Sequence, residues 1–118
     1  MQMIDALIKT IALEMPMDPE EMAEFKKLLE IVEVNAEQVH LQISEERWLS
    51  MGVHLLSTIR RVGKCEKLPT VDQFVIDQVS PDMMELSKKI LLKIDSDIND
   101  NTEAVLLALH FETAKNSN

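Results

Sequence analysis

Apolar residues recur every three or four positions along most of the chain, which is the spacing of one face of an α-helix. The clearest apolar stripe consists of Trp48, Gly52, Leu55, Leu56, Ile59 and Val62. Ser44 is a favourable N-cap residue, and Gly63 is a typical residue at a helix end. The pattern therefore predicts one amphipathic helix over residues 44–63, and we expect the rest of the chain to form the bundle that presents it.

Two helices are predicted before this one. The first covers residues 1–14, and its apolar stripe is Ile4, Leu7, Ile8 and Ile11. The second follows Asp18, a good N-cap, begins at Pro19, a good first helical residue, and continues to about Val34. Residues 35–43 are compatible with either a continuation of that helix or a loop.

Three further helices are predicted after residue 63. A brief one covers residues 71–79, and its inward-facing side chains are predicted to be Val71, Phe74 and Val75. The next begins at Pro81 and continues to about Ile98. The last covers about Thr102 to Lys115 and is apolar around most of its circumference, so we expect it at the centre of the bundle.

The composition supports the same fold class. Only 3% of the residues are aromatic, tyrosine is absent and there are 2 glycines, which leaves little material for strands and hairpins. We therefore predict an all-α protein, a compact bundle of five or possibly six helices. Residues 1–17 form an N-terminal helical extension and residues 18–118 the main bundle, within a single compact domain.

Charge and cysteine content narrow the function classes. The 21 acidic residues outnumber the 12 basic ones and the net charge is −9, which argues against direct binding of nucleic acid or an anionic membrane. A single cysteine, Cys65, excludes an intramolecular disulfide and suits a reducing compartment. No apolar run approaches membrane-spanning length, and the N-terminus lacks the features of a signal peptide. We expect a cytoplasmic protein.

The candidates for enzyme or metal chemistry are few. Glu37 and His40 have the Glu-x-x-His spacing of di-metal carboxylate bundles, but the second such motif is missing, which favours a surface histidine. No Ser/His/Asp or Cys/His arrangement is evident, and Cys65 is best read as an incidental thiol. We therefore expect no enzyme activity, no cofactor and no metal.

The other two histidines have more suggestive surroundings. His54 is predicted on the polar side of its helix, with Ser50 and Thr58 one turn away and Arg47 and Arg61 two turns away. Such a stripe could hold added negative charge, since arginines pair well with anions.

His110 is predicted on the apolar side of the last helix, with Glu103 two turns earlier on the same stripe. Taken alone, such a residue is more often a hydrogen-bonded core histidine than a functional site.

Together, the two histidine neighbourhoods resemble the paired motifs of the PTS regulation domain, or PRD. Residues 53–61, Val-His-Leu-Leu-Ser-Thr-Ile-Arg-Arg, resemble the first motif, in which an arginine follows the histidine by seven positions. Residues 103–111, Glu-Ala-Val-Leu-Leu-Ala-Leu-His-Phe, resemble the second, in which a glutamate precedes Leu-His. The lead-in at 43–49 and the helix beginning at Pro81 match in order and spacing, and the resemblance covers about residues 25–116.

The resemblance implies a five-helix bundle, usually dimeric, that regulates bacterial antiterminators and transcriptional activators. In that family the histidines are phosphorylated by the histidine phosphocarrier protein or by the IIB component of a sugar permease. By this resemblance His54 and His110 are the candidate phosphoacceptors, with Arg61 and Glu103 as supporting residues. A phosphoryl group on the stripe of His54 could also pair with Arg47, because this arginine lies two turns away on the same stripe. We expect His54 to be the accessible acceptor, and His110 to lie near Glu103 and to need a subunit-interface groove.

Two features depart from the family pattern. Val53 stands where many members have an acidic residue, and no RNA-binding, helix-turn-helix or transporter-like segment is present. The expected function is therefore a stand-alone, homodimeric regulatory protein that acts through contacts with an unknown effector protein. The alternatives are a helical adaptor that is not phosphorylated and a small metal-binding bundle that uses Glu37 and His40.

Overall fold

The chain is all-α in the computed structural model, which describes residues 2–66, 69–94 and 101–116. Within these residues there are six helices and no strand. The helices are α1 (Gln2–Glu14), α2 (Pro19–Gln38), α3 (Glu45–Gly63), α4 (Gln73–Ile76), α5 (Pro81–Ile94) and α6 (Asn101–Asn116). The predicted fold class is confirmed. None of the described helices is long and apolar enough to cross a membrane.

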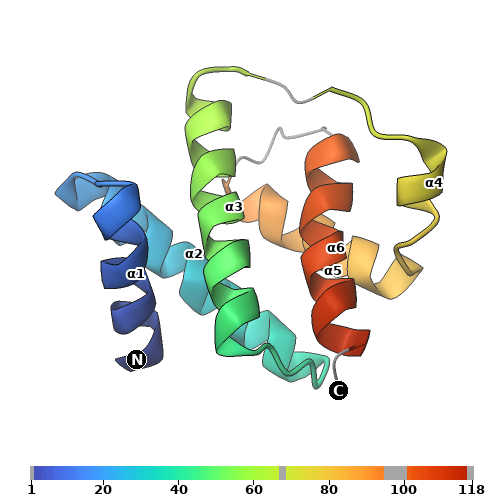
Figure 1. Ribbon diagram of the computed structural model, residues 1–118, viewed down its shortest axis with the longest axis horizontal. Helices are drawn as coiled ribbons and strands as arrows, with labels where there is room; N and C mark the ends of the chain where they lie inside the picture. The colour runs from blue at the N-terminus through green and yellow to red at the C-terminus, as the bar shows by residue number, and fades with distance from the viewer. Residues whose placement is uncertain (1, 67–68, 95–100, 117–118) are drawn as a thin grey trace.

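The five longer helices form two layers. In Figure 1, α1, α3 and α6 lie in front, and α2 and α5 cross behind them. The helices α3 and α6 lie side by side and run in opposite directions. Each layer contacts the other through α1 on α2, α2 on α3 and α5 on α6.

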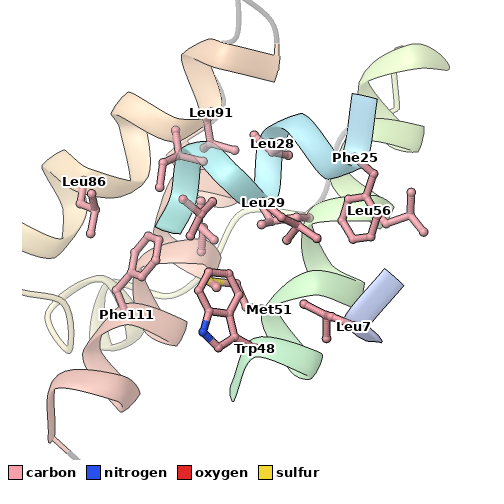
Figure 2. Close-up of a cluster of buried hydrophobic side chains, with 14 of the residues drawn as sticks. Leu7, Phe25, Leu28, Leu29, Trp48, Met51, Leu56, Leu86, Leu91 and Phe111 are labelled. Carbon is pink, nitrogen blue, oxygen red and sulfur yellow. The ribbon is translucent and has the colours of Figure 1, made fainter. Parts of the chain in front are cut away.

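The core lies between the layers and draws on all five longer helices. Figure 2 shows its aromatic and aliphatic side chains converging from α2, α3, α5 and α6, with Leu7 of α1 at one edge. Phe25, Met51 and Phe111 are fully buried. Burial of each such side chain stabilises the fold by roughly 1.5–3 kcal/mol. The predicted stripe of α1 is buried as well, so this N-terminal helix shares the core of the main bundle.

Local capping explains where α2 and α3 begin. The Asp18 carboxylate accepts the backbone N–H of Glu21 at 2.8 Å, and the Ser44 hydroxyl accepts that of Arg47 at 3.2 Å. Both N-cap residues are the ones that the sequence predicted. Residues 35–43, for which the sequence allowed either a helix or a loop, contain both, because α2 continues to Gln38 and the chain then turns at His40, whose φ is 56°.

The end of α3 differs in detail from the prediction. The helix ends at Gly63, but this glycine does not have a positive φ. The left-handed residue is Cys65, with φ 57°, two positions later. The peptide N–H groups of Lys64 and Cys65 bond to carbonyls of the last turn and close the helix.

The predicted helix over 71–79 is largely wrong. Only Gln73–Ile76 is helical, and the Phe74 side chain is 74% exposed instead of facing inward. A single helical turn is too short to present an apolar stripe to the core. The helix that follows begins at Pro81 as predicted and reaches Ile94, and its predicted last residues lie outside the described part of the chain.

A close approach of α1 to α3 depends on Gly52. A Cβ atom added there would lie 2.8 Å from Cδ1 of Ile11 and 3.7 Å from Cδ2 of Leu7. In contrast, a Cβ atom added at Gly63 would meet no atom within 4 Å. The two glycines of α3 therefore differ in what they do for packing.

We predict that Gly52→Leu lowers the free energy of unfolding by about 1–3 kcal/mol, because the larger side chain separates α1 from α3. The matched control is Gly63→Leu, which adds the same side chain to the same helix in open space and should leave stability unchanged or slightly raised. Urea denaturation of both variants measures the difference. Equal stabilities would show that α1 does not pack on α3 in this way.

Candidate functional site

A polar seam joins α3 to α6 along the front layer. On α3, Arg47, His54 and Arg61 are spaced by seven residues, which places them on one stripe of the helix at intervals of about two turns. On α6, Glu103 and His110 have the same spacing. Because the two helices are antiparallel, Arg47 lies opposite His110 and Arg61 lies opposite Glu103. We call these five residues and Thr58 the α3–α6 seam.

One end of the seam is a buried ion pair. Glu103 is 2% exposed, and its carboxylate receives two hydrogen bonds from Arg61, from Nε at 2.9 Å and from Nη2 at 2.8 Å. The same Nη2 donates to the hydroxyl of Thr58 at 3.2 Å. That hydroxyl, which is fully buried, donates in turn to the backbone carbonyl of His54 at 2.9 Å. This bidentate geometry ties the C-terminal half of α3 to the first turn of α6.

The other end is an arginine–histidine contact. Nη1 of Arg47 lies 3.2 Å from Nδ1 of His110. A guanidinium group can only donate, so Nδ1 of His110 acts as the acceptor. The imidazole of His110 is therefore neutral and carries its proton on Nε2.

The two histidine rings meet at the middle of the seam. Their centroids are 5.3 Å apart and their planes are tilted by 52°. The Nε2 atom of His54 is buried and makes no hydrogen bond within the described residues. The pair is thus half-buried, with one ring nitrogen of His54 enclosed beside the ring of His110.

The electrostatics of the seam keep both rings uncharged near neutral pH. Burial, and after it the positive charges of a protonated His54 and of Arg47, together lower the pKa of His110 to about 4. Burial also lowers the pKa of His54, and Arg61 acts in the same direction. The carboxylate of Glu103 opposes this by raising the pKa of His54. Each imidazole therefore offers a ring-nitrogen lone pair at neutral pH.

The α3–α6 seam is suited to binding an anion and to reacting through a nucleophilic ring nitrogen, and it is poorly suited to binding a cation. Arg47 and Arg61 flank the histidine pair, and one of the nearest carboxylates, that of Glu103, is already held by Arg61. A metal ion would meet two guanidinium groups. Within the described residues no group of three histidine, cysteine, aspartate or glutamate side chains is arranged to hold a metal.

The structure brings together all five site residues that the sequence singled out, but it corrects their pairing. His54 is not on a solvent-facing stripe: it faces α6 and is half-buried. The carboxylate of Glu103 raises the pKa of His54, whereas it is not among the groups that shift the pKa of His110, which lies two turns further along α6. Of the two arginines, Arg47 contacts His110 and Arg61 contacts Glu103. The physical reason is that α3 and α6 are antiparallel. The first residue of the stripe on α3 therefore lies beside the last residue of the stripe on α6, and the reverse.

The metal-binding alternative loses its geometric basis. Glu37 belongs to α2, but His40 lies beyond the end of that helix with φ 56°. The two side chains therefore do not share a helical face as the spacing suggested. Cys65 is exposed in the loop after α3 and is not part of the seam.

Thr58 is the seam residue whose role sequence analysis missed. It was expected on the polar side beside His54, whereas its side chain is fully buried and lies between Arg61 and Glu103. A signal was present, because Thr58 follows Met51 by seven positions and so continues a stripe that is buried in the core.

Comparison of the chain with models of protein families, with curated proteins and with solved structures returned no match.

We predict that Arg61→Met lowers the free energy of unfolding by about 3–5 kcal/mol, because it removes the guanidinium group from a buried carboxylate. Adding Glu103→Met should restore most of the loss. The matched control is Arg60→Met, since the neighbouring pair with Glu21 is more exposed and should cost only about 1 kcal/mol. Urea denaturation of the wild type and the three variants forms the test. An Arg61 variant no weaker than the Arg60 variant would contradict the buried pair.

We predict that stability falls as the pH is lowered from about 6.5 to about 4. The ordinary histidine pKa of 6.5 applies to the unfolded chain, and the pKa of His110 in the folded protein is about 4. Between these values the unfolded state binds one more proton at this residue, which removes about 1 kcal/mol per pH unit. The stability that comes from keeping His110 neutral is fully present above pH 6.5 and is lost below about pH 4.

The measurement is the free energy of unfolding as a function of pH for wild type and His110→Gln. The slope between pH 6.5 and 4 should be shallower in the variant, whereas His40→Gln, at an exposed histidine, should keep the wild-type slope. Parallel profiles for wild type and the His110 variant would rule out a buried neutral imidazole.

Proposed function

We propose that this protein is a regulatory module switched by transfer of a phosphoryl group to the histidine pair of the α3–α6 seam. The observation that carries the proposal is the contact of Arg47 with Nδ1 of His110 beside the ring of His54. It supports a neutral, nucleophilic nitrogen with a fixed cation next to it. The resemblance of the two histidine neighbourhoods to the PRD motifs points to the same chemistry.

The proposed acceptor is His110 more than His54, which reverses the sequence-based expectation. The Nε2 atom of His54 is enclosed, and its surroundings include the negative charge of Glu103. Added phosphoryl oxygens would be repelled there. At His110 the nearest charge is the guanidinium of Arg47, which can pair with phosphate oxygens.

The transfer step conserves atoms and charge in a simple way. The Nδ1 lone pair of His110 attacks the phosphorus of a phosphohistidine donor that is protonated on its other ring nitrogen. The nitrogen–phosphorus bond of the donor breaks as the new one forms, and the donor ring leaves with the bonding electron pair as a neutral imidazole. The proton on Nε2 of His110 remains in place. Arg47 moves from the lone pair to the phosphoryl oxygens.

The consequence of the transfer would be a change in how α3 packs on α6. A phosphoryl group adds about −1.5 to −2 charge to a half-buried seam that already contains the carboxylate of Glu103. Attraction to Arg47 and repulsion along the seam would shift the two helices relative to each other. An altered surface that an effector protein recognises is the proposed output, in a bacterial cytoplasm and without enzymatic activity of its own.

A second candidate is an adaptor that is never phosphorylated, with both histidines serving as packing residues. The enclosed Nε2 of His54 favours this reading for that residue. The experiment below separates the two candidates.

We predict that the protein accepts a phosphoryl group from phosphoenolpyruvate through enzyme I and the histidine phosphocarrier protein, from a IIB component, or from the small donor phosphoramidate. An acid-labile phosphoryl group should appear in the intact mass. It should persist in His40→Ala, the third-histidine control, and disappear in His110→Ala. Arg47→Ala should slow labelling about tenfold or more, because a hydrogen bond to a charged group is lost.

Label that remains when both His54 and His110 are replaced would contradict the proposed site. No label from any of these donors would contradict the switch and favour the adaptor. Label that depends on His54 instead of His110 would keep a phosphoryl switch but overturn the role assigned to Arg47.

A further inference from the structure

The Nε2 atom of His54 has no partner among the contacts that hold the α3–α6 seam together. It is buried and makes no hydrogen bond within the described residues. A buried polar atom without a partner costs free energy, so its presence in a folded protein needs an explanation. The ring of His110 lies beside that of His54, with the two centroids 5.3 Å apart. A group attached to His110 is therefore in a position to become the missing partner.

Charges alternate along the seam except at the two histidines. The positive Arg47 contacts His110 at one end, and at the other end the negative Glu103 is paired with the positive Arg61. A phosphoryl group on His110 places about −1.5 to −2 charge next to Arg47. The neutral ring of His54 then lies between two anions, because the carboxylate of Glu103 is also close enough to act on it. The phosphoryl group and the carboxylate repel each other across this uncharged ring.

Arg61 is poorly placed to offset that repulsion. Its guanidinium donates two hydrogen bonds to Glu103, at 2.9 and 2.8 Å, and one to the hydroxyl of Thr58. Moving it to a phosphoryl group would leave a carboxylate that is 2% exposed without its cation, which is strongly unfavourable. The group that can change its own charge without moving is the imidazole of His54.

We propose that His54 takes up one proton from the solvent when His110 is phosphorylated, and that its Nε2–H then donates to a phosphoryl oxygen. This inference rests on the proposed transfer of a phosphoryl group to His110. The new hydrogen bond is charge-assisted and gives the buried Nε2 atom its partner. The charges along the seam then alternate without interruption, in the order Arg47, phosphoryl group, His54, Glu103, Arg61.

The charged groups that face His54 explain why the proton arrives with the phosphoryl group. In the unmodified protein burial lowers the pKa of His54, the Glu103 carboxylate of α6 raises it, and Arg61 of α3 lowers it. A phosphoryl group on His110 acts in the same direction as Glu103, and an opposite charge within about 4–6 Å raises a histidine pKa by about 1–3 units. The phosphorylated protein therefore keeps this proton up to a higher pH. The proton decides how much of the repulsion between the phosphoryl group and Glu103 remains to move the helices.

The first test replaces the phosphoryl group by a permanent charge. His110→Glu introduces a carboxylate at the proposed acceptor, and the matched control His110→Gln introduces a side chain of the same shape without the charge. Titration of the His54 imidazole by nuclear magnetic resonance should give a pKa about one unit or more higher in the charged variant. His40, which is exposed and outside the seam, should titrate alike in both. Equal pKa values of His54 in the two folded variants would overturn the inference.

The second test keeps His110 and measures proton uptake directly. The phosphoryl group is equilibrated with the histidine phosphocarrier protein over the pH range in which histidines titrate, and native mass spectrometry gives the labelled fraction. If labelling is linked to proton uptake, its equilibrium constant falls by up to about tenfold per pH unit between the two pKa values of His54. His54→Gln keeps a hydrogen-bond donor and cannot titrate, so its constant should fall less steeply. His40→Gln should follow the wild type.

Failure of the proton coupling is distinguishable from failure of the phosphoryl transfer. Label with the same pH dependence in wild type and in His54→Gln would overturn the coupling and leave the transfer to His110 standing. Label that is lost in His54→Gln but kept in His110→Ala would make His54 the acceptor and overturn the inference as well. No label from any donor would overturn both proposals. Circular dichroism of each variant verifies that it retains the helical fold.

Discussion

The ion pair between Arg61 and Glu103 is the contact on which the arrangement of the front layer depends. A carboxylate that is 2% exposed is costly to bury without compensation, and Arg61 supplies two hydrogen bonds and an opposite charge. This contact sets the position of α3 along α6. Once it is made, the seven-residue spacing carries His54 to the middle of the seam and Arg47 to His110.

Burial shapes the chemistry of the histidine pair, because it is the largest cause of the lowered pKa of each ring. The charges of a protonated His54 and of Arg47 add to the shift at His110. At His54, Arg61 adds to the shift and the carboxylate of Glu103 opposes it. Neutral ring nitrogens next to arginines favour the transfer or binding of anionic groups over the binding of metal ions.

The histidine seam belongs to α3 and α6 in the front layer, and α2 and α5 lie behind it. The layers are joined by packing of α5 on α6 and of α2 on α3, so a shift of α3 against α6 would be felt by the back layer through a shared core.

The sequence by itself determined the helical class, the starts of α2, α3 and α5, and the two stripes that bear the seam residues, because capping and apolar spacing are local properties. Only the tertiary structure decided what each stripe meets. His54 sits among polar neighbours on α3 and so was expected to face solvent, yet α6 packs there. Thr58 became a buried link for the same reason, while Phe74 was left exposed because its helix is a single turn. Which helix packs against which face depends on the apolar surface that all the helices together remove from water. The residue pattern of one helix does not determine that total.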